Sequence, residues 1–291
     1  MEIFMQGRIY MTGVIDVGGG LRGIYGAGVF DRCIDDGISF DMCIGVSAGS
    51  ANTASFLGGQ RGRNYKFYAE YSMRKEYMGL SCLLHGGSFI NLDYVYRTLS
   101  NSGGENPLDY RALVNNKSEY IVVAADSVSG KPHYFTKEDM HENDYGILIA
   151  SSSIPAVCRP AKINGKAYFD GGVADPVPVD FALEHGCDRL VVILTRPCDY
   201  VLNPSLDLKA AKLLRFSYPN ISKALKERKS LYDKGVEKAK QLEKEGKCLI
   251  VAPDDCGGLE TLTKDPTKLD ALYKKGYEDA AKIKEFVFSH K

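Results

Sequence analysis

The fold of this chain is decided by the stretch Phe40-Asp41-Met42-Cys43-Ile44-Gly45-Val46-Ser47-Ala48-Gly49. Its first half is a short apolar run suited to a buried strand, and its second half reads G-x-S-x-G before a helix that we expect over 50–57. A serine on a sharp strand-to-helix turn exposes its hydroxyl, and small flanking residues such as Gly45 and Gly49 let the two backbones pass closely. The stretch therefore predicts a nucleophile elbow at Ser47, although the same spacing also occurs in ordinary Gly-Ser turns.

A second strand-to-helix unit precedes the elbow. The run Thr12-Gly13-Val14-Ile15-Asp16-Val17 predicts a strand, and a glycine-rich loop follows it. The spacing of Val29, Cys33 and Ile34 then predicts a helix that stops before Gly37. Because two consecutive strand-to-helix units require parallel strands, we expect an α/β sandwich.

The elements after the elbow continue this pattern. The sequence predicts buried strands at Glu119–Asp126 and Arg189–Thr195 and an edge strand at Lys131–Thr136. It predicts a helix over 147–157 that is ended by Pro155, and a further helix over Pro176–His185. A hairpin is expected over Ala161–Phe169, with its turn at Asn164-Gly165. The hairpin delivers Asp170-Gly171-Gly172 at its end. The segment Tyr65–Leu99 mixes aromatic, apolar and charged residues, and two interpretations stay open: a lid or acyl-chain groove, or ordinary helical contacts with the core.

The last third of the chain is richer in charge. We expect helices over Lys209–Phe216, Ile221–Glu245 and Asp265–Phe288, with a strand at Cys248–Pro253 that joins the edge of the sheet. The sequence is thus divided into a motif-bearing domain at 11–203 and a mostly helical extension at 204–291 that packs on it. One basic cluster is interpreted as a solvated helix face rather than a contact with an anionic surface: Lys223, Lys226, Arg228 and Lys229.

Composition excludes several classes of function. The 291 residues carry 37 Lys and Arg against 37 Asp and Glu, so no net charge draws the chain to nucleic acid. No run approaches the ~20 apolar residues that span a bilayer, and Met1–Tyr10 does not resemble a secretion signal. The eight cysteines contain no C-x-x-C pair, which argues against a zinc or redox site. We therefore expect a cytoplasmic protein that binds no metal and no nucleic acid.

Ester cleavage needs a nucleophile, a base and donors for the oxyanion. Ser47 is the candidate nucleophile, and the uncovered N–H groups of Gly18-Gly19-Gly20 are candidate donors at a helix start. The base is open from the residues alone, because none of the five histidines has a convincing context; of the two that follow Asp170, His185 suits a helix end and His290 is penultimate. Asp170 itself is a candidate, but a carboxylate of ordinary pKa is a weak base for a hydroxyl and needs a dry site.

Two other classes compete with a hydrolase. Gly18-x-Gly20-x-x-Gly23 after a strand also matches the dinucleotide-binding fingerprint of oxidoreductases. A dinucleotide site requires an acidic residue at the end of the second strand to bind the ribose, but in this chain the second strand is followed by the elbow. A catalytically idle lipid-binding protein is the third class, and intact Ser47 and Asp170 argue against it.

Four ordered motifs together resemble the patatin-like phospholipases over about Gly13 to Thr195: Gly18-Gly19-Gly20-Leu21-Arg22-Gly23, Gly45-Val46-Ser47-Ala48-Gly49, Ala150-Ser151-Ser152-Ser153-Ile154-Pro155 and Asp170-Gly171-Gly172. The resemblance implies a three-layer α/β/α sandwich with a mainly parallel sheet. It also implies a Ser47–Asp170 catalytic dyad. The family's oxyanion-hole motif matches Gly18, Gly19, Gly20, Arg22 and Gly23, and the supporting glycines are Gly45, Gly49, Gly171 and Gly172.

The same resemblance implies the reaction class. Members of the family cleave acyl esters of phospholipids, lysophospholipids or neutral lipids without calcium, so we expect a lipid or other acyl-ester substrate and no cofactor. Peripheral contact with the inner face of the membrane and the oligomeric state are left open. The sequence departs from many relatives at Asp175, where they carry asparagine, which makes the local hydrogen bonding uncertain.

Overall fold

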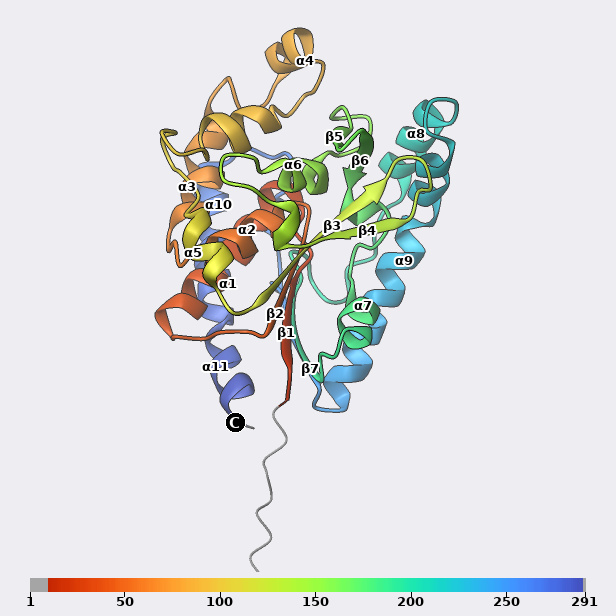
Figure 1. Cartoon of the computed structure of the whole chain (residues 1–291). Helices are drawn as coiled ribbons and strands as arrows, with labels where there is room; N and C mark the ends of the chain where they lie inside the picture. The colour runs from red at the N-terminus through yellow and green to blue at the C-terminus, as the bar shows by residue number, and fades with distance from the viewer. Residues whose placement is uncertain (1–9, 290–291) are drawn as a thin grey trace, which may run out of the picture.

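A computed structural model describes residues 10–289 of the chain; Met1–Ile9, His290 and Lys291 lie outside the described residues. Its centre is an eight-stranded sheet (Figure 1). Five strands are parallel, in the order β3-β2-β1-β7-β8. Their bounds are β1 Thr12–Asp16, β2 Met42–Val46, β3 Glu119–Asp126, β7 Arg189–Ile193 and β8 Cys248–Val251.

Three further strands are joined to β3 by antiparallel pairing. They are β4 Pro132–Phe135, β5 Ala161–Ile163 and β6 Lys166–Asp170. Strands β4 and β6 pair with β3 itself, and β5 pairs with β6. The predicted hairpin is confirmed, with Asn164 and Gly165 both at positive φ in the turn between β5 and β6. The predicted edge strand is β4, and the strand predicted late in the chain is β8, which pairs with β7 at the opposite edge of the sheet.

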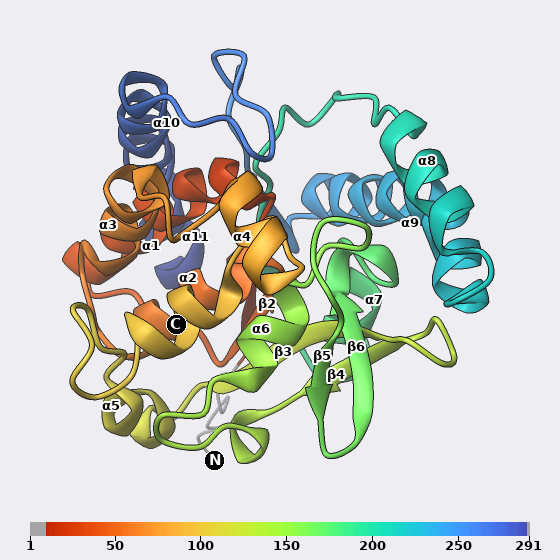
Figure 2. The same cartoon turned by 90° about the horizontal axis from the view of Figure 1, so that it is seen from above.

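Helices cover both faces of the sheet, which gives three layers (Figures 1 and 2). Successive residues of a strand point to opposite faces, so Val14 packs into one core and Ile15 into the other. The first face is covered by α1 Ile24–Asp35, α2 Ala48–Leu57, α3 Arg63–Ala69, α5 Tyr110–Asn115, α6 Gly146–Ser152, α10 Pro266–Asp279 and α11 Ala281–Phe288. The second face is covered by α7 Val179–Glu184 and α9 Pro219–Lys244. The predicted α/β/α architecture is confirmed.

Two short helices project at one end of the molecule. They are α4 Leu80–Gly86, in the segment Tyr65–Leu99, and α8 Ser205–Leu214, which packs against α9 (Figure 1). Single turns of 3-10 helix occur at Gly20–Gly23, Tyr71–Met73, Lys137–Asp139 and Gly171–Val173, and a π-helix at Tyr94–Thr98. None of the helices between residues 10 and 289 combines the length and the apolar character needed to cross a membrane.

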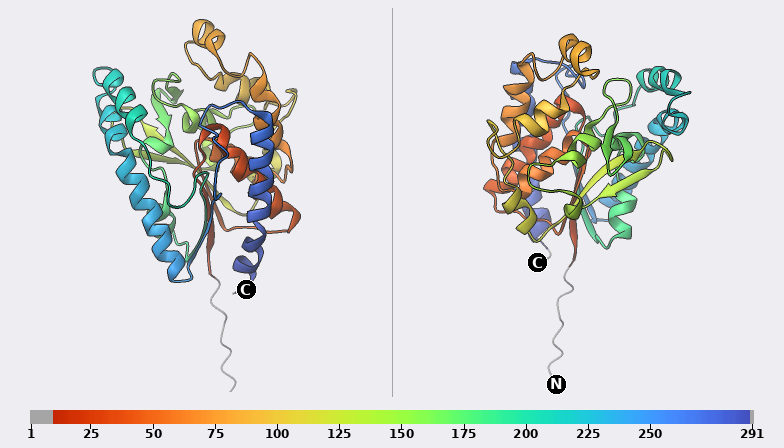
Figure 3. Two further views of the ribbon diagram at one scale, coloured as in Figure 1. Left: turned by 180° about the vertical axis from the view of Figure 1, so that it is seen from behind. Right: turned by 45° about the horizontal axis from the view of Figure 1, so that its top comes forward.

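The C-terminal extension packs closely on the first helix of the chain. Helix α10 lies along α1 (Figure 3), and a methyl group on Gly28 of α1 would stand 2.1 Å from the carbonyl oxygen of Tyr273. With β8 in the sheet, the extension shares both the sheet and the core of the preceding residues. The division of the chain at Asn203 stays a prediction. The single helix predicted over Asp265–Phe288 is two helices, broken at Ala280, four residues after Gly276.

Candidate active site

Ser47 lies on a strained turn between β2 and α2. Its backbone has φ 56° and ψ −129°, a combination that residues with side chains rarely adopt. The Ser47 N–H donates to Oγ of Ser151 at 2.9 Å, and that hydroxyl donates to the carbonyl oxygen of Val123 at 2.7 Å. A methyl group on Gly49 would stand 2.2 Å from the carbonyl oxygen of Asp16. The Ser151 hydroxyl on one side and the backbone of Asp16 on the other therefore fix the turn.

Strand β3 brings Asp170 to Ser47. Val46, the last residue of β2, is paired with Val123, and Asp170, the last residue of β6, is paired with the next residue, Ala124. Because β4 occupies the other edge of β3 along Val122–Ala125, β2 and β6 share one edge and converge on it from opposite directions. Ser47 Oγ donates to Asp170 Oδ2 at 2.6 Å, although 123 residues separate the two in sequence.

The carboxyl group of Asp170 is held in a dry environment. Its residue is only 7% exposed, and burial raises the pKa of the carboxyl above its usual value. Three groups lower that pKa in turn: the hydroxyl of Ser47, the N–H of Gly172, which donates to Asp170 Oδ1 at 2.8 Å, and the charge of Arg228. The carboxylate is thus desolvated and oriented, which increases its basicity relative to a carboxylate in water.

The glycine loop lies beside Ser47. All three glycines have positive φ, 66° at Gly18, 129° at Gly19 and 61° at Gly20, and Gly18 is packed against the carbonyl oxygen of Val46. The N–H of Gly18 donates to Asp16 Oδ1 at 2.9 Å, so it already has a protein acceptor. Burial raises the pKa of Asp16 to about 6.

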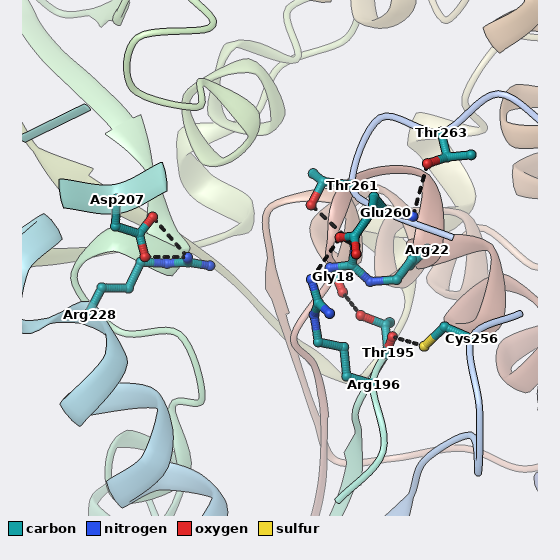
Figure 4. A network of polar contacts seen from close by, with 10 residues as sticks. All are labelled: Gly18, Arg22, Thr195, Arg196, Asp207, Arg228, Cys256, Glu260, Thr261 and Thr263. Atoms are coloured by element: carbon teal, nitrogen blue, oxygen red, sulfur yellow. Dashed lines mark hydrogen bonds and ion pairs between the residues drawn. The ribbon is translucent and has the colours of Figure 1, made fainter. Parts of the chain in front are cut away.

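The C-terminal extension covers the start of the helix that follows this loop. The N–H of Leu21 donates to the carbonyl oxygen of Thr261 at 2.8 Å. Arg22 is buried, with its guanidinium directed to Thr261 Oγ1 at 3.2 Å and to Glu260 at 3.8 Å. Figure 4 shows Arg22 and Arg196 converging on Glu260. Burial, together with the neighbouring charge of Arg196, lowers the pKa of Arg22 to about 10.

Two cavities meet at Ser47. The wider one, about 650 Å³, is lined by Ser47, Asp170, the glycine loop, and side chains of α8 and α9. The narrower one, about 60 Å³, is mainly apolar and is lined largely by residues of the 63–100 segment: Phe67, Tyr68, Tyr77, Met78, Ile90, Leu92, Val95 and Tyr96. Residues of the Tyr65–Leu99 segment therefore both pack in the core and line a cavity beside the serine, so the two interpretations of that segment are compatible.

Arg228 is the site residue that sequence reasoning placed wrongly. The sequence predicts a solvated helix face for Arg228, but its Nε donates to the carbonyl oxygen of Gly172 at 2.7 Å. Its Nη1 also contacts Asp207 at 3.1 Å (Figure 4). It lines the wider cavity. The regular Lys and Glu pattern of α9 gives no local signal that separates Arg228 from Lys226 or Lys229.

The other candidate groups lie elsewhere. His185 ends α7, where its Nδ1 is 2.8 Å from the carbonyl oxygen of Phe181, and neither His133 nor His141 lines a cavity at Ser47. Asp175 accepts a hydrogen bond from the Tyr134 hydroxyl at 2.6 Å, and burial raises its pKa to about 6. Among residues 10–289, no group of three or more His, Cys, Asp or Glu side chains is arranged to hold a metal ion.

Comparison with known proteins gives two family matches and several relatives. The family model of the patatin-like phospholipases matches residues 17–183, and that of a domain of unknown function (DUF6363) matches residues 218–287. The chain is 32% identical over 204 residues to the uncharacterized protein YjjU of Escherichia coli, covering 69% of this chain and 56% of that protein. It is 25% identical over 188 residues to lysophospholipase NTE1 of Candida albicans, covering 62% of this chain but only 13% of the relative.

Solved structures also align with the chain. The crystal structure of VipD from Legionella pneumophila aligns with a TM-score of 0.49 and 15% identity, covering 97% of this chain and 67% of that one. The chain spans about half the length of YjjU and a small part of the fungal relative. The family model, however, covers more than half of this chain and includes the elbow, the glycine loop and Asp170. The chain therefore belongs to the patatin-like phospholipase family.

Proposed function

We propose that this protein is a serine hydrolase that cleaves carboxylic esters of lipids through a Ser47–Asp170 dyad. The observation that carries the proposal is the 2.6 Å hydrogen bond from Ser47 Oγ to the buried Asp170 carboxylate, at the junction of two cavities. Family membership supports a lipid substrate, and none of His133, His141 and His185 lines either cavity at the serine.

The reaction proceeds in two halves. Asp170 accepts the proton of Ser47 Oγ as this oxygen attacks the ester carbonyl carbon, and the tetrahedral intermediate then expels the alcohol, which takes the proton from Asp170. Water attacks the acyl-Ser47 ester in the second half, with Asp170 again as base, and releases the carboxylic acid. We assign the oxyanion donors to the N–H groups of Gly19 and Gly20, because that of Gly18 is engaged by Asp16.

The two cavities suggest how the ester is oriented. The narrow cavity is lined by aromatic and aliphatic side chains, which suits the acyl carbon atoms nearest the ester carbonyl. The wide cavity contains Arg22, Arg196 and Arg228, which suits the polar alcohol portion of a lipid. A dinucleotide is a poorer fit, because the Leu21 N–H at the helix start is already bonded to Thr261 and no acidic side chain ends β2.

A fluorophosphonate probe and a soluble p-nitrophenyl ester test the proposal. The native protein is expected to be labelled and to turn over the ester, and Ser47→Ala is expected to lose both while retaining its circular dichroism spectrum. Ser129→Ala, at an exposed turn, is the matched control and should behave as wild type. Turnover that persists in Ser47→Ala would overturn the assignment. Lipid binding by a native protein that is neither labelled nor active would indicate a catalytically idle lipid-binding protein instead.

A further inference from the structure

Exposed apolar side chains are concentrated on the two projecting helices. Of the eleven large hydrophobic side chains that are exposed among residues 10–289, seven lie on α4, on α8 or two residues after it: Leu80, Leu83, Leu84, Leu206, Leu208, Leu213 and Phe216. Leu84 is 81% exposed, Leu206 76% and Phe216 84%. Such a concentration on a folded chain marks an interaction surface rather than the scattered exposure of single side chains.

Both helices flank the cavities that contain Ser47. Leu206 and Leu213 of α8 line the wider cavity. Helix α4 lies between Met78 and Ile90, which form an isolated bridge with each other and line the narrower cavity. Figure 1 shows α4 and α8 projecting at the same end of the molecule, and Figure 2, from above, shows them on different sides of α6 and the β5–β6 hairpin.

The charges on α8 favour one kind of partner. Exposed Lys209 and Lys212 alternate along the helix with exposed leucines, and exposed Arg215 follows its end beside Phe216. A helix that combines leucine or phenylalanine with lysine and arginine is suited to the boundary between acyl chains and anionic headgroups. A protein partner would need one continuous surface complementary to two separate helices, whereas a bilayer adapts to both.

We propose that α4 and α8 form a docking surface for an anionic lipid bilayer, which places the mouth of the Ser47 cavities against the membrane. The two helices insert their exposed leucines between lipid headgroups, and the cations of α8 contact lipid phosphates. The inference extends the proposed function, because it names the surface from which the substrate enters. It uses no residue of the dyad or of the glycine loop.

Vesicle binding tests the docking surface independently of catalysis. The full chain with Ser47→Ala is sedimented with vesicles of phosphatidylcholine, with or without phosphatidylglycerol. Binding is expected to be at least about tenfold stronger with phosphatidylglycerol. Leu80→Ser with Leu84→Ser, and separately Leu206→Ser with Leu213→Ser, are each expected to weaken it about tenfold or more. Lys212→Gln with Arg215→Gln should remove most of the preference for anionic vesicles.

The control is Phe288→Ser on α11, far from these helices, and it should bind as the Ser47→Ala parent does. Unchanged vesicle binding in both leucine pairs, or no binding by the folded parent, would overturn the docking surface. So would a dimer in sedimentation velocity that the leucine pairs dissociate while vesicles are not bound, because the partner would then be a second copy.

The α4 pair with Ser47 intact separates this proposal from the proposed function. Its turnover of a soluble p-nitrophenyl ester is expected to match wild type, while its hydrolysis of vesicle lipid falls with its vesicle binding. If the parent binds vesicles through these leucines but the native protein hydrolyses no ester, the docking surface stands and the hydrolase assignment is wrong. Equal loss of both activities in a folded α4 pair would contradict a role confined to docking.

Discussion

The turns around Ser47 and the two projecting helices differ in how tightly their surroundings hold them. A methyl group on Gly49 of α2 would stand 2.2 Å from backbone, whereas a methyl group on Gly86 of α4 would meet nothing within 4 Å. The first region orients the groups that perform chemistry, where a small displacement is costly. The second presents leucines whose side chains are largely exposed to solvent. From this comparison we expect the proposed chemistry to depend on close packing around Ser47, and the proposed contact with lipid to depend on exposed side chains of α4 and α8.

The largest effect is expected where the tightly held region supplies the base. Asp170→Asn retains an oxygen that can accept the Ser47 hydrogen bond but cannot take its proton, so kcat should fall about 10²–10⁴-fold. Initial rates on a soluble ester measure this. His185→Ala is the matched control, because His185 lies at the end of α7 away from the serine, and it should leave kcat near wild type. The opposite pattern would assign the base to histidine.

The two helical glycines test the comparison directly. Gly49→Ala should lower the free energy of unfolding by about 1–3 kcal/mol, because the new methyl group cannot be accommodated against Asp16. Gly86→Ala should change it by less than about 1 kcal/mol, in the stabilising direction, by restricting the unfolded chain. Urea unfolding of both variants measures the difference. Equal effects would show that packing around the elbow is no tighter than packing around α4.

Asp175 shows that tight packing also has a cost in stability. Its pKa is raised from the usual 3.8 to about 6, so the folded state binds this proton more strongly than the unfolded state does. The free energy of unfolding therefore falls as pH rises from about 4 to about 6 and stays lower above that range. Asp175→Asn lacks this loss and can still accept the Tyr134 hydrogen bond. We expect it to be more stable than wild type by about 1–2 kcal/mol near neutral pH, with little difference at about pH 4.

Unfolding in urea at both pH values checks this expectation for Asp175. The titration of Asp16 is common to both proteins and cancels in the difference between them. A variant that is less stable than wild type near neutral pH would show that the charge of Asp175 is compensated in the folded state.

A smaller, pH-dependent effect is expected at Arg228, which joins the C-terminal extension to the loop after Asp170. Arg228→Gln removes a positive charge that lowers the pKa of Asp170, so this pKa should rise. Because Asp170 must be ionised to accept a proton, the acidic limb of the kcat/KM profile should move to higher pH, with activity on that limb falling several-fold. Arg228→Lys keeps the charge and should keep the limb near that of wild type.

Two results at Arg228 would count against an electrostatic role. One is a limb that moves equally in Arg228→Gln and Arg228→Lys, which would point to the hydrogen bond with Gly172 instead. The other is a uniform loss of activity at every pH.

Much of the site could be predicted because its signals are local. The elbow, the glycine loop and the Asn164-Gly165 turn each depend on residues that are neighbours in sequence, and the structure has the expected strand, loop or helix at each. The contact between Arg228 and Gly172 spans 56 residues. Nothing in the Lys and Glu pattern of α9 marks Arg228 as the cation that contacts the loop after Asp170. No local sequence signal marks Thr261 either, although its carbonyl oxygen accepts a hydrogen bond from the N–H of Leu21, directly after the glycine loop.

The position of β8 affects how the protein is made as well as how it is held together. Strand β7 precedes its neighbour β8 by about 55 residues (193 to 248), and a ribosome adds roughly 5–20 residues per second. For several seconds of synthesis the fully buried residues of β7 therefore have an unpaired edge, which is the kind of surface that recruits strands of other chains. Once β8 has been synthesised it can pair with this edge of β7 and protect it from aggregation. Substitutions that disrupt residues 248–251 are therefore expected to reduce the yield of folded protein before they alter the chemistry proposed at Ser47.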